Sequence, residues 1–293
     1  MRVFITGGTG LIGSAVVAEL LAHGHGVLAL ARSDASAQAA AAAGAEVVRG
    51  GLADLDVLRT AAAQADGVIH LAFANDFSSP QALAAAVAEE GAALAALGEA
   101  LTGTDRPFVV CSGTPAAPGR AATEDDPIPT DGPVGGRGRA VGGVLALASR
   151  GVRASAVRLP RTVHNEGHGG FAGLLTGIAR QTGVSGYAGD GTQRWPAVHA
   201  LDAAVLFRLA LEKAEAGTSW HAVDDEGDQV RDIAAVIGRR LGLPVEPVPA
   251  QTYGPLGVIF AADQPASSAR TREVLGWKPQ HPSLLADLEN LQP

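Results

Sequence analysis

A glycine-rich loop near the N-terminus has the residue types and spacing of a phosphate-binding site. It follows the apolar run 2–6, precedes an amphipathic stretch over 11–23, and reads Thr6-Gly7-Gly8-Thr9-Gly10-Leu11-Ile12-Gly13. The first glycine allows a sharp turn after a strand, Gly10 lets a pyrophosphate approach the backbone, and Gly13 permits a helix to pack tightly on the strand. The free N–H groups and positive end of that helix favour a diphosphate. In this context the motif predicts a dinucleotide-binding loop.

The residues after the second predicted strand bear on which dinucleotide binds. A carboxylate at this strand end binds the ribose hydroxyls of NAD and repels the 2′-phosphate of NADP. Here Ala31 stands at that place, and Arg32 and Ser33 follow it, so a guanidinium fork and a hydroxyl are available to a phosphate. The sequence therefore favours NADP(H) over NAD(H), the alternative being that Arg32 is a solvated residue opening a loop. Asp34 is predicted to cap helix 35–43.

The first half of the chain alternates short β-rich runs with alanine-rich helical stretches. The predicted strands cover 2–6, 26–31, 46–49, 67–71, 107–112 and 153–159. The predicted helices between them cover 11–23, 35–43, 54–65, 80–102 and 137–150. Parallel strands joined through helices form a doubly wound α/β sheet with right-handed crossovers, the Rossmann arrangement.

The second half is less regular. Its predicted elements are helix 171–182, strands 185–188 and 195–198, helix 202–215, strand 218–222 and helix 229–241. We expect a Rossmann domain over 1–163, to which 195–222 returns, and a smaller α+β substrate-binding portion over 164–293. The Gly- and Pro-rich segment 113–136 leaves the sheet edge where ligands bind in such folds. Its acidic run 123–126 is predicted to be a solvated lid surface.

Composition excludes several classes of partner and compartment. The chain has 293 residues and a net charge of −8, which argues against nucleic acid or an anionic membrane as a partner. A single cysteine, Cys111, rules out an internal disulfide and fits a reducing compartment. No secretory signal is expected, and no apolar run reaches the roughly 20 residues of a membrane span. The expectation is a cytoplasmic protein acting on a small molecule, with a homodimer as one option for its assembly.

Several landmarks together resemble the short-chain dehydrogenase/reductase superfamily, in its extended and atypical, epimerase/dehydratase-like branches. Beyond the glycine loop they are His70-Leu71-Ala72, Cys111-Ser112-Gly113-Thr114, Leu159-Pro160-Arg161, and Arg194 to His199 with Asp202. The resemblance covers nearly the whole chain. It implies cofactor contacts from Thr6, Gly7, Thr9, Gly10, Leu11, Ile12, Gly13, Arg32, Ser33, Leu52, Leu71 and Ala72.

The usual catalytic pair of that superfamily is missing. Its members use a tyrosine as the acid and a lysine four residues later, but this chain has only two tyrosines, Tyr187 and Tyr253, and each is followed four residues later by glycine. Alignment through helix 137–150 places Gly135 at the tyrosine position and Arg139 at the lysine position. As a permanent donor, Arg139 could bind the nicotinamide ribose, but it cannot release a proton at neutral pH.

The remaining candidates for chemistry lie at the ends of the fifth and sixth strands. Ser112 matches the superfamily's Ser or Thr and is predicted to orient the substrate oxygen, the alternative being a hydroxyl that caps the strand end. The proton would come from water or from His164, and Arg161 could supply charge. No metal is expected, because the glycine-rich segment that holds His164 and His168 is typical of a loop and not of a zinc-binding helix.

These observations lead to one leading hypothesis and two alternatives. The leading one is an NADP(H)-dependent oxidoreductase that reduces a carbonyl, or oxidises an alcohol, of a medium-sized organic molecule with a non-standard proton donor. Ser112, Arg139 and the long segment 113–136 favour this enzyme. The first alternative is an NADP-binding sensor or scaffold without turnover, favoured by the missing pair. The second is an enzyme similar to sugar-nucleotide epimerases and dehydratases.

Overall fold

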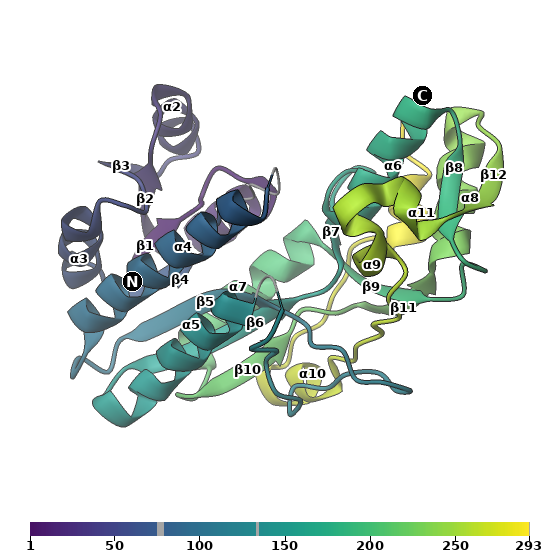
Figure 1. The fold of residues 1–293 in the computed structure, drawn as a ribbon. Coiled ribbons are helices and arrows are strands. Elements are labelled where there is room, and N and C mark those ends of the chain that lie inside the picture. Colours follow the sequence, from purple (N-terminus) through teal and green to yellow (C-terminus); the bar gives the residue numbers. More distant parts are fainter. Residues whose placement is uncertain (75–78, 133–134, 293) are drawn as a thin grey trace.

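A seven-stranded parallel sheet forms the centre of the chain (Figure 1). The computed structural model describes residues 1–74, 79–132 and 135–292. The strand order is β10-β6-β5-β4-β1-β2-β3, with every neighbouring pair parallel. The strands are β1 (Arg2–Thr6), β2 (Gly26–Ala31), β3 (Glu46–Arg49), β4 (Gly67–His70), β5 (Pro107–Gly113), β6 (Arg153–Leu159) and β10 (Thr218–His221). The predicted doubly wound Rossmann sheet is confirmed.

Helices cover both faces of this sheet, which is why its strands are apolar on both sides. In β1 the side chains of Val3 and Ile5 join the core under α1 (Leu11–Ala22), α2 (Asp34–Ala42) and α7 (Ala200–Lys213). Phe4 points the other way, into the core under α3 (Leu55–Gln64), α4 (Pro80–Leu101) and α5 (Gly135–Ala146). Val3, Phe4 and Ile5 are fully buried. A 3-10 turn, Leu147–Arg150, follows α5.

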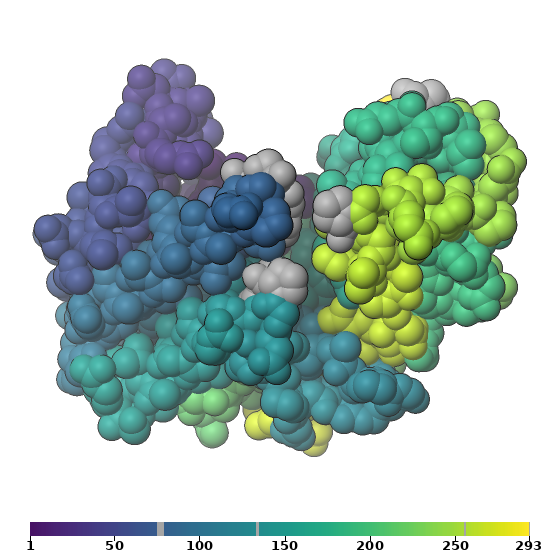
Figure 2. Space-filling view, viewed as in Figure 1, coloured from purple at the N-terminus to yellow at the C-terminus, as the bar shows by residue number. Residues whose placement is uncertain are grey.

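A smaller portion with mixed sheets follows β6. β7 (Thr162–His164), β9 (Arg194–His199) and β11 (Asp225–Gln229) form a three-stranded sheet, and β8 (Ser185–Ala188) pairs with β12 (Val245–Val248). The helices are α6 (Gly170–Thr182), α8 (Val230–Leu241), α9 (Gly257–Phe260), α10 (Ala269–Leu275) and α11 (Leu284–Leu288), with a 3-10 segment at Ala250–Leu256. Phe171, Trp195 and Phe260 pack edge to face in its core. On the face shown in Figure 2, a hollow separates this portion from the Rossmann sheet and its helices.

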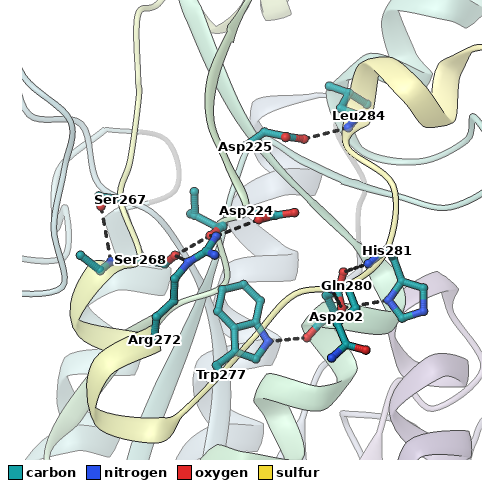
Figure 3. Close-up of polar contacts among 12 residues, drawn as sticks. Asp202, Asp224, Asp225, Ser267, Ser268, Arg272, Trp277, Gln280, His281 and Leu284 are labelled. Carbon is teal, nitrogen blue, oxygen red and sulfur yellow. Dashed lines mark hydrogen bonds and ion pairs between the residues drawn. The ribbon is translucent and has the colours of Figure 1, made fainter.

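Asp202 of α7 binds the C-terminal segment 277–281 through several hydrogen bonds (Figure 3). The Asp202 carboxylate accepts hydrogen bonds from the backbone N–H groups of Gln280 and His281 at 2.9 and 3.0 Å and contacts His281 Nδ1 at 2.8 Å. Trp277 Nε1 donates to the Asp202 carbonyl at 2.9 Å. The cap of α7 is the His199 side chain, which accepts from Leu201 N. Asp202 therefore anchors the C-terminal segment.

No helix in the described part of the chain is long and apolar enough to cross a membrane.

Candidate functional site

The glycine loop between β1 and α1 has the shape of a phosphate cradle. Gly7 has a φ of 75°, and a Cβ there would approach Ala72 N at 2.8 Å. A Cβ on Gly13 would collide with the Gly7 carbonyl, whereas one on Gly10 would meet only that carbonyl oxygen, at 3.6 Å. Gly7 and Gly13 thus serve packing, and the space over Gly10 is open. Since no side chain caps α1, its first N–H groups are available to an anion.

A buried pair behind the loop joins the ends of β1 and β4. Thr6 Oγ1 and His70 Nδ1 are 2.9 Å apart, and Ala72 N donates to Thr6 Oγ1 at 3.3 Å. Burial, followed by the positive charge of Arg137, lowers the pKa of His70 to about 4. His70 is therefore neutral at physiological pH, and it positions the loop without adding charge.

A cavity of about 620 Å³ runs from the glycine loop along the ends of β2 and β3. This volume lies within the usual range for small-molecule sites, roughly 300–1,000 Å³. Among the predicted cofactor residues, those that line it are Gly7, Thr9, Gly10, Arg32, Ser33, Leu52, Leu71 and Ala72. The others, Thr6, Leu11, Ile12 and Gly13, build the strand end and helix start beneath the loop. The residues present fit a dinucleotide.

Two charged residues lie at the end of this cavity next to β2. Arg32 has no hydrogen-bond partner among the described residues, and Asp34 forms an ion pair with another arginine. The exposed Arg32 side chain makes no hydrogen bond to any described residue. Asp34 pairs with Arg49 at 2.7 Å. The predicted cap at Asp34 is wrong: Ser33 caps α2 by accepting from Ser36 N, and Asp34 is the first helical residue. The cause is the serine at N3, which completes a reciprocal capping box with Ser33.

Ser112 lies at the end of β5, partly buried and paired in register with Arg158 of β6. Its hydroxyl has no hydrogen-bond partner in the described part of the chain, so no contact there supports the alternative role as a strand-end cap. Burial raises the pKa of the adjacent Cys111 thiol to about 11. Cys111 is therefore a protonated thiol at neutral pH, and the polar group at this strand end is Ser112.

Two arginines on α5 point in different directions. Arg139 is exposed and donates to the Thr130 carbonyl, and its predicted ribose contact stays a prediction. Arg137 binds the Glu90 carboxylate of α4 through Nε and Nη2, at 2.7 and 2.8 Å. The guanidinium carbon of Arg137 also lies 4.0 Å from the centre of the Phe73 ring, beside the cavity. No sequence pattern indicates this pair, because 47 positions separate its members and nothing local marks them.

His164 lies in β7, buried within the small three-stranded sheet. Its Nδ1 is 2.7 Å from Asp287 Oδ2, which also accepts from Gly167 N at 3.0 Å. Burial opposes ionisation of Asp287, but these contacts hold the pKa of its carboxyl below the usual value. His164 Nε2 is buried and has no partner among the described residues. If Nδ1 carries the proton toward Asp287, Nε2 can accept one, and the predicted role as proton donor stays a prediction.

The groups around His164 also have the residue types of metal ligands. His164, His199 and Asp287 offer ligand atoms within 4.8 Å of one another. This cluster comes from β7, β9 and α11, whereas His168 is outside it and exchanges backbone hydrogen bonds with Asn165. The contact between His164 and Asp287 already gives both side chains a partner, so the cluster holds the C-terminal helix against β7.

The segment after β5 is partly built into the core. Glu124 Oε1 accepts from Thr271 N at 2.9 Å and from Thr271 Oγ1 at 2.6 Å, and Glu124 is only 6% exposed. Arg158 donates to the carbonyls of Glu124 and Asp126 at 3.3 and 2.8 Å. The predicted solvated lid surface over 123–126 is therefore wrong at Glu124, because buried donors on α10 bind its carboxylate.

Both tyrosines belong to the smaller portion. Tyr187 lies in β8, and Tyr253 packs on Phe260 with ring centres 4.6 Å apart. Burial raises the pKa of Tyr253 to about 12. Neither residue lies in α5, where the superfamily places its acid.

The fold and the loop together define a dinucleotide-binding α/β protein. The chain belongs to the NAD dependent epimerase/dehydratase family, whose model matches residues 3–224. The family implies a nicotinamide dinucleotide as cofactor. An uncharacterised protein of Schizosaccharomyces pombe is 44% identical over 98% of each chain. The 3-diazoavenalumate denitrifying reductase of a Streptomyces species is 31% identical over 97% of each. UDP-glucose 4-epimerase of Thermotoga maritima shares the fold at a TM-score of 0.78, with 19% identity over 99% of this chain and 97% of that one.

Proposed function

We propose that the chain is an NADP(H)-dependent oxidoreductase that reduces a carbonyl, or oxidises an alcohol, of a medium-sized organic molecule. The choice of NADP(H) rests on Arg32, which lines the cavity and has no hydrogen-bond partner among the described residues. The nearby Asp34 is paired with Arg49. A 2′-phosphate would give the guanidinium of Arg32 a bidentate partner. The printed name of the Streptomyces relative, a reductase, supports the reaction class.

The residues that would act on the substrate lie at the ends of β5 and β6. The bound cofactor would supply or accept the hydride. The Ser112 hydroxyl would donate a hydrogen bond to the substrate oxygen, which stabilises the negative charge that develops there. Water or His164 would exchange the proton. Arg137, held by Glu90 beside the cavity, is better placed than Arg139 to contact the nicotinamide ribose.

One observation favours a second candidate, a cofactor-binding protein without turnover. The tyrosine and lysine of the superfamily are missing, and α5 has Gly135 and Arg139 at the positions where they would stand. Such a protein would bind NADPH without consuming it. Binding would change the stability of the protein or the set of partners that it binds.

The experiment measures binding and turnover separately. NADPH and NADH affinities come from titration of cofactor fluorescence. Turnover is followed by NADPH absorbance with aldehydes, ketones, imines and activated alkenes, and in reverse with alcohols and NADP⁺. Binding together with substrate-dependent oxidation supports the reductase. Tight NADPH binding with no net oxidation across the panel would overturn the reductase and leave the sensor. Interconversion of UDP-sugars without net cofactor consumption would indicate the epimerase.

A further inference from the structure

Arg161 is a partly buried cation without an acidic partner. It follows β6, and among the described residues its side chain makes no hydrogen bond and no ion pair. Its Nε atom is completely shielded from solvent and has no acceptor. Among the described residues, the guanidinium has a cation–π contact with Phe171, at 5.3 Å from its carbon to the centre of the ring.

Two other shielded arginines, Arg137 and Arg158, have hydrogen-bond acceptors within the described chain. Arg137 has a bidentate carboxylate partner in Glu90. Arg158, three residues before Arg161, donates to two backbone carbonyls of the segment after β5. Arg137 therefore has an anionic partner, and Arg158 has two acceptors at Nη1, although its Nε lacks an acceptor, as that of Arg161 does. Arg161 differs from both, because none of its side-chain nitrogen atoms has a hydrogen-bond partner among the described residues.

The position of Arg161 is that of a ligand-binding residue. β6 lies beside β5, and Thr114 N donates to the Leu159 carbonyl, so Arg161 follows directly on the carboxyl-terminal edge near Ser112. In open α/β sheets, ligands bind in the crevice outside this edge. Phe171, against which the guanidinium stacks, belongs to α6 of the smaller portion. Arg161 therefore lies in the connection between β6 of the Rossmann sheet and β7 of the smaller portion, two strands that Figure 1 labels.

An unpaired, shielded cation is costly to keep. Removing a charged group from water without a hydrogen-bond partner destabilises the fold, and buried charges in proteins are normally paired. Burial lowers the pKa of Arg161 to about 10, so the group is still a cation at neutral pH. A bound anion would supply both the missing charge and the missing acceptors.

We propose that Arg161 binds a carboxylate of the substrate, so that the substrates are oxo acids or the corresponding hydroxy acids. This inference rests on the proposed reductase activity and adds the chemical class of its substrate. A planar guanidinium fork matches a carboxylate through two parallel hydrogen bonds. One unpaired cation balances the single negative charge of a carboxylate, whereas a phosphate monoester would bring close to two. The Phe171 ring beside the guanidinium fits an organic acid with an apolar body.

The test compares matched pairs that differ only in the anion. Pyruvate, levulinate and benzoylformate are each assayed against their methyl esters, with NADPH as the reductant. Variants Arg161→Gln and Arg161→Lys are compared with Arg150→Gln, which removes an exposed arginine of the 3-10 turn after α5. Isothermal titration calorimetry measures binding of the same acids, of methyl benzoylformate and of inorganic phosphate to the full chain, with and without NADP⁺.

If the proposal holds, kcat/KM for at least one acid exceeds that for its ester tenfold or more, Arg161→Gln removes this preference, and Arg161→Lys retains part of it. Arg161→Gln and Arg150→Gln keep the wild-type Tm or a higher one. Acid binding that Arg161→Gln abolishes, without any turnover, supports the carboxylate site and overturns the reductase.

Other results would overturn the carboxylate site. One such result is an equal kcat/KM for acids and esters that Arg161→Gln does not change, which would support the reductase but not the carboxylate site. Another is that none of the three acids binds. Phosphate binding tighter than carboxylate binding at Arg161 contradicts the choice of anion. A large drop in Tm for both Arg161 variants would show that this cation is structural.

Discussion

The carboxylate of Glu90 holds the guanidinium of Arg137 through two hydrogen bonds, at 2.7 and 2.8 Å, and so joins α4 to α5 beside the candidate cofactor cavity. Glu90 is only 2% exposed, so its carboxylate is largely removed from water, whereas the Arg137 side chain is 29% exposed. The charge of Arg137 acts on His70 and Cys111, at the ends of β4 and β5. Arg137 is thus the α5 cation directed at the sheet edge, and Arg139 is not.

The first prediction separates these two arginines. Replacing Arg137 alone would leave Glu90 as an unpaired buried charge, at a cost of about 3–5 kcal/mol in stability. The double variant Glu90→Gln/Arg137→Gln avoids that penalty, and we expect it to fold and to bind NADPH at least tenfold more weakly. Arg139→Gln should change the affinity less than threefold. Titration of cofactor fluorescence measures the NADPH affinity of both variants. A larger loss of affinity in Arg139→Gln than in the double variant would indicate that Arg139 contacts the ribose.

The second prediction concerns the choice of cofactor. We expect NADPH to bind more tightly than NADH and Arg32→Ala to narrow that gap, because a lost charge-assisted phosphate contact costs about 1.5–3 kcal/mol, or roughly tenfold to a hundredfold in affinity. Arg59→Ala, which removes a partly exposed arginine of α3 that pairs with Asp56 and Glu99, is the control for loss of a positive charge. Equal affinity of the wild-type chain for the two cofactors would refute the role of Arg32.

The Rossmann elements could be predicted from the sequence because their signals are local. Apolar runs bounded by glycines indicated all six strands of the first half, and the loop from Gly7 to Gly13 is itself one contiguous motif. β11 could not be predicted, because its residues, Asp225–Gln229, are polar and show no alternation of apolar and polar side chains. This strand forms by pairing with β9, and such context outweighs strand propensity.

The site was predictable only where its residues are neighbours in sequence. The cavity residues around Arg32 and Ser33 follow one strand end, so a motif could indicate them. The contact between His164 and Asp287 spans 123 positions, and no pattern on either side marks it. The same is true of Glu90 and Arg137. Partners of this kind are fixed by the packing of distant elements, which one sequence does not reveal.

The third prediction uses the different surroundings of two glycines. Gly10→Val should abolish NADPH binding and leave the circular dichroism spectrum unchanged, because its side chain enters the space that the pyrophosphate needs and meets little of the protein. Gly13→Ala should instead lower Tm, because its Cβ collides with the Gly7 carbonyl. A folded Gly10→Val variant with normal NADPH affinity would show that the diphosphate binds elsewhere.

The fourth prediction tests Ser112. Ser112→Ala should lower kcat/KM by roughly a hundredfold to a thousandfold, or about 2.7–4 kcal/mol, as expected when an oriented donor to a developing oxyanion is lost. NADPH affinity should not change, since the hydroxyl serves the substrate. Ser149→Ala removes an exposed hydroxyl that bonds only within its own turn, and it should have no effect. Unchanged turnover in Ser112→Ala would mean that another group orients the substrate.

The last prediction concerns a carboxyl group that destabilises the fold at neutral pH. Burial, together with the charges of Asp225 and Asp232, raises the pKa of Asp228 to about 6, and its Oδ2 has no partner among the described residues. An unfolded aspartate has a pKa of about 3.9. Because the folded pKa is the higher one, folding takes up a proton, and stability falls as the pH rises from about 4 through about 6.

Asp228→Asn should therefore raise Tm at pH 7.5, where the wild-type carboxylate is ionised, and the difference should shrink toward pH 4.5, where both side chains are neutral. Differential scanning calorimetry from pH 4.5 to 8 measures this, with Glu246→Gln as the control for loss of an exposed negative charge. A Tm difference that does not depend on pH, or one that grows as the pH falls, would show that Asp228 is ionised below pH 4.5 in the folded chain.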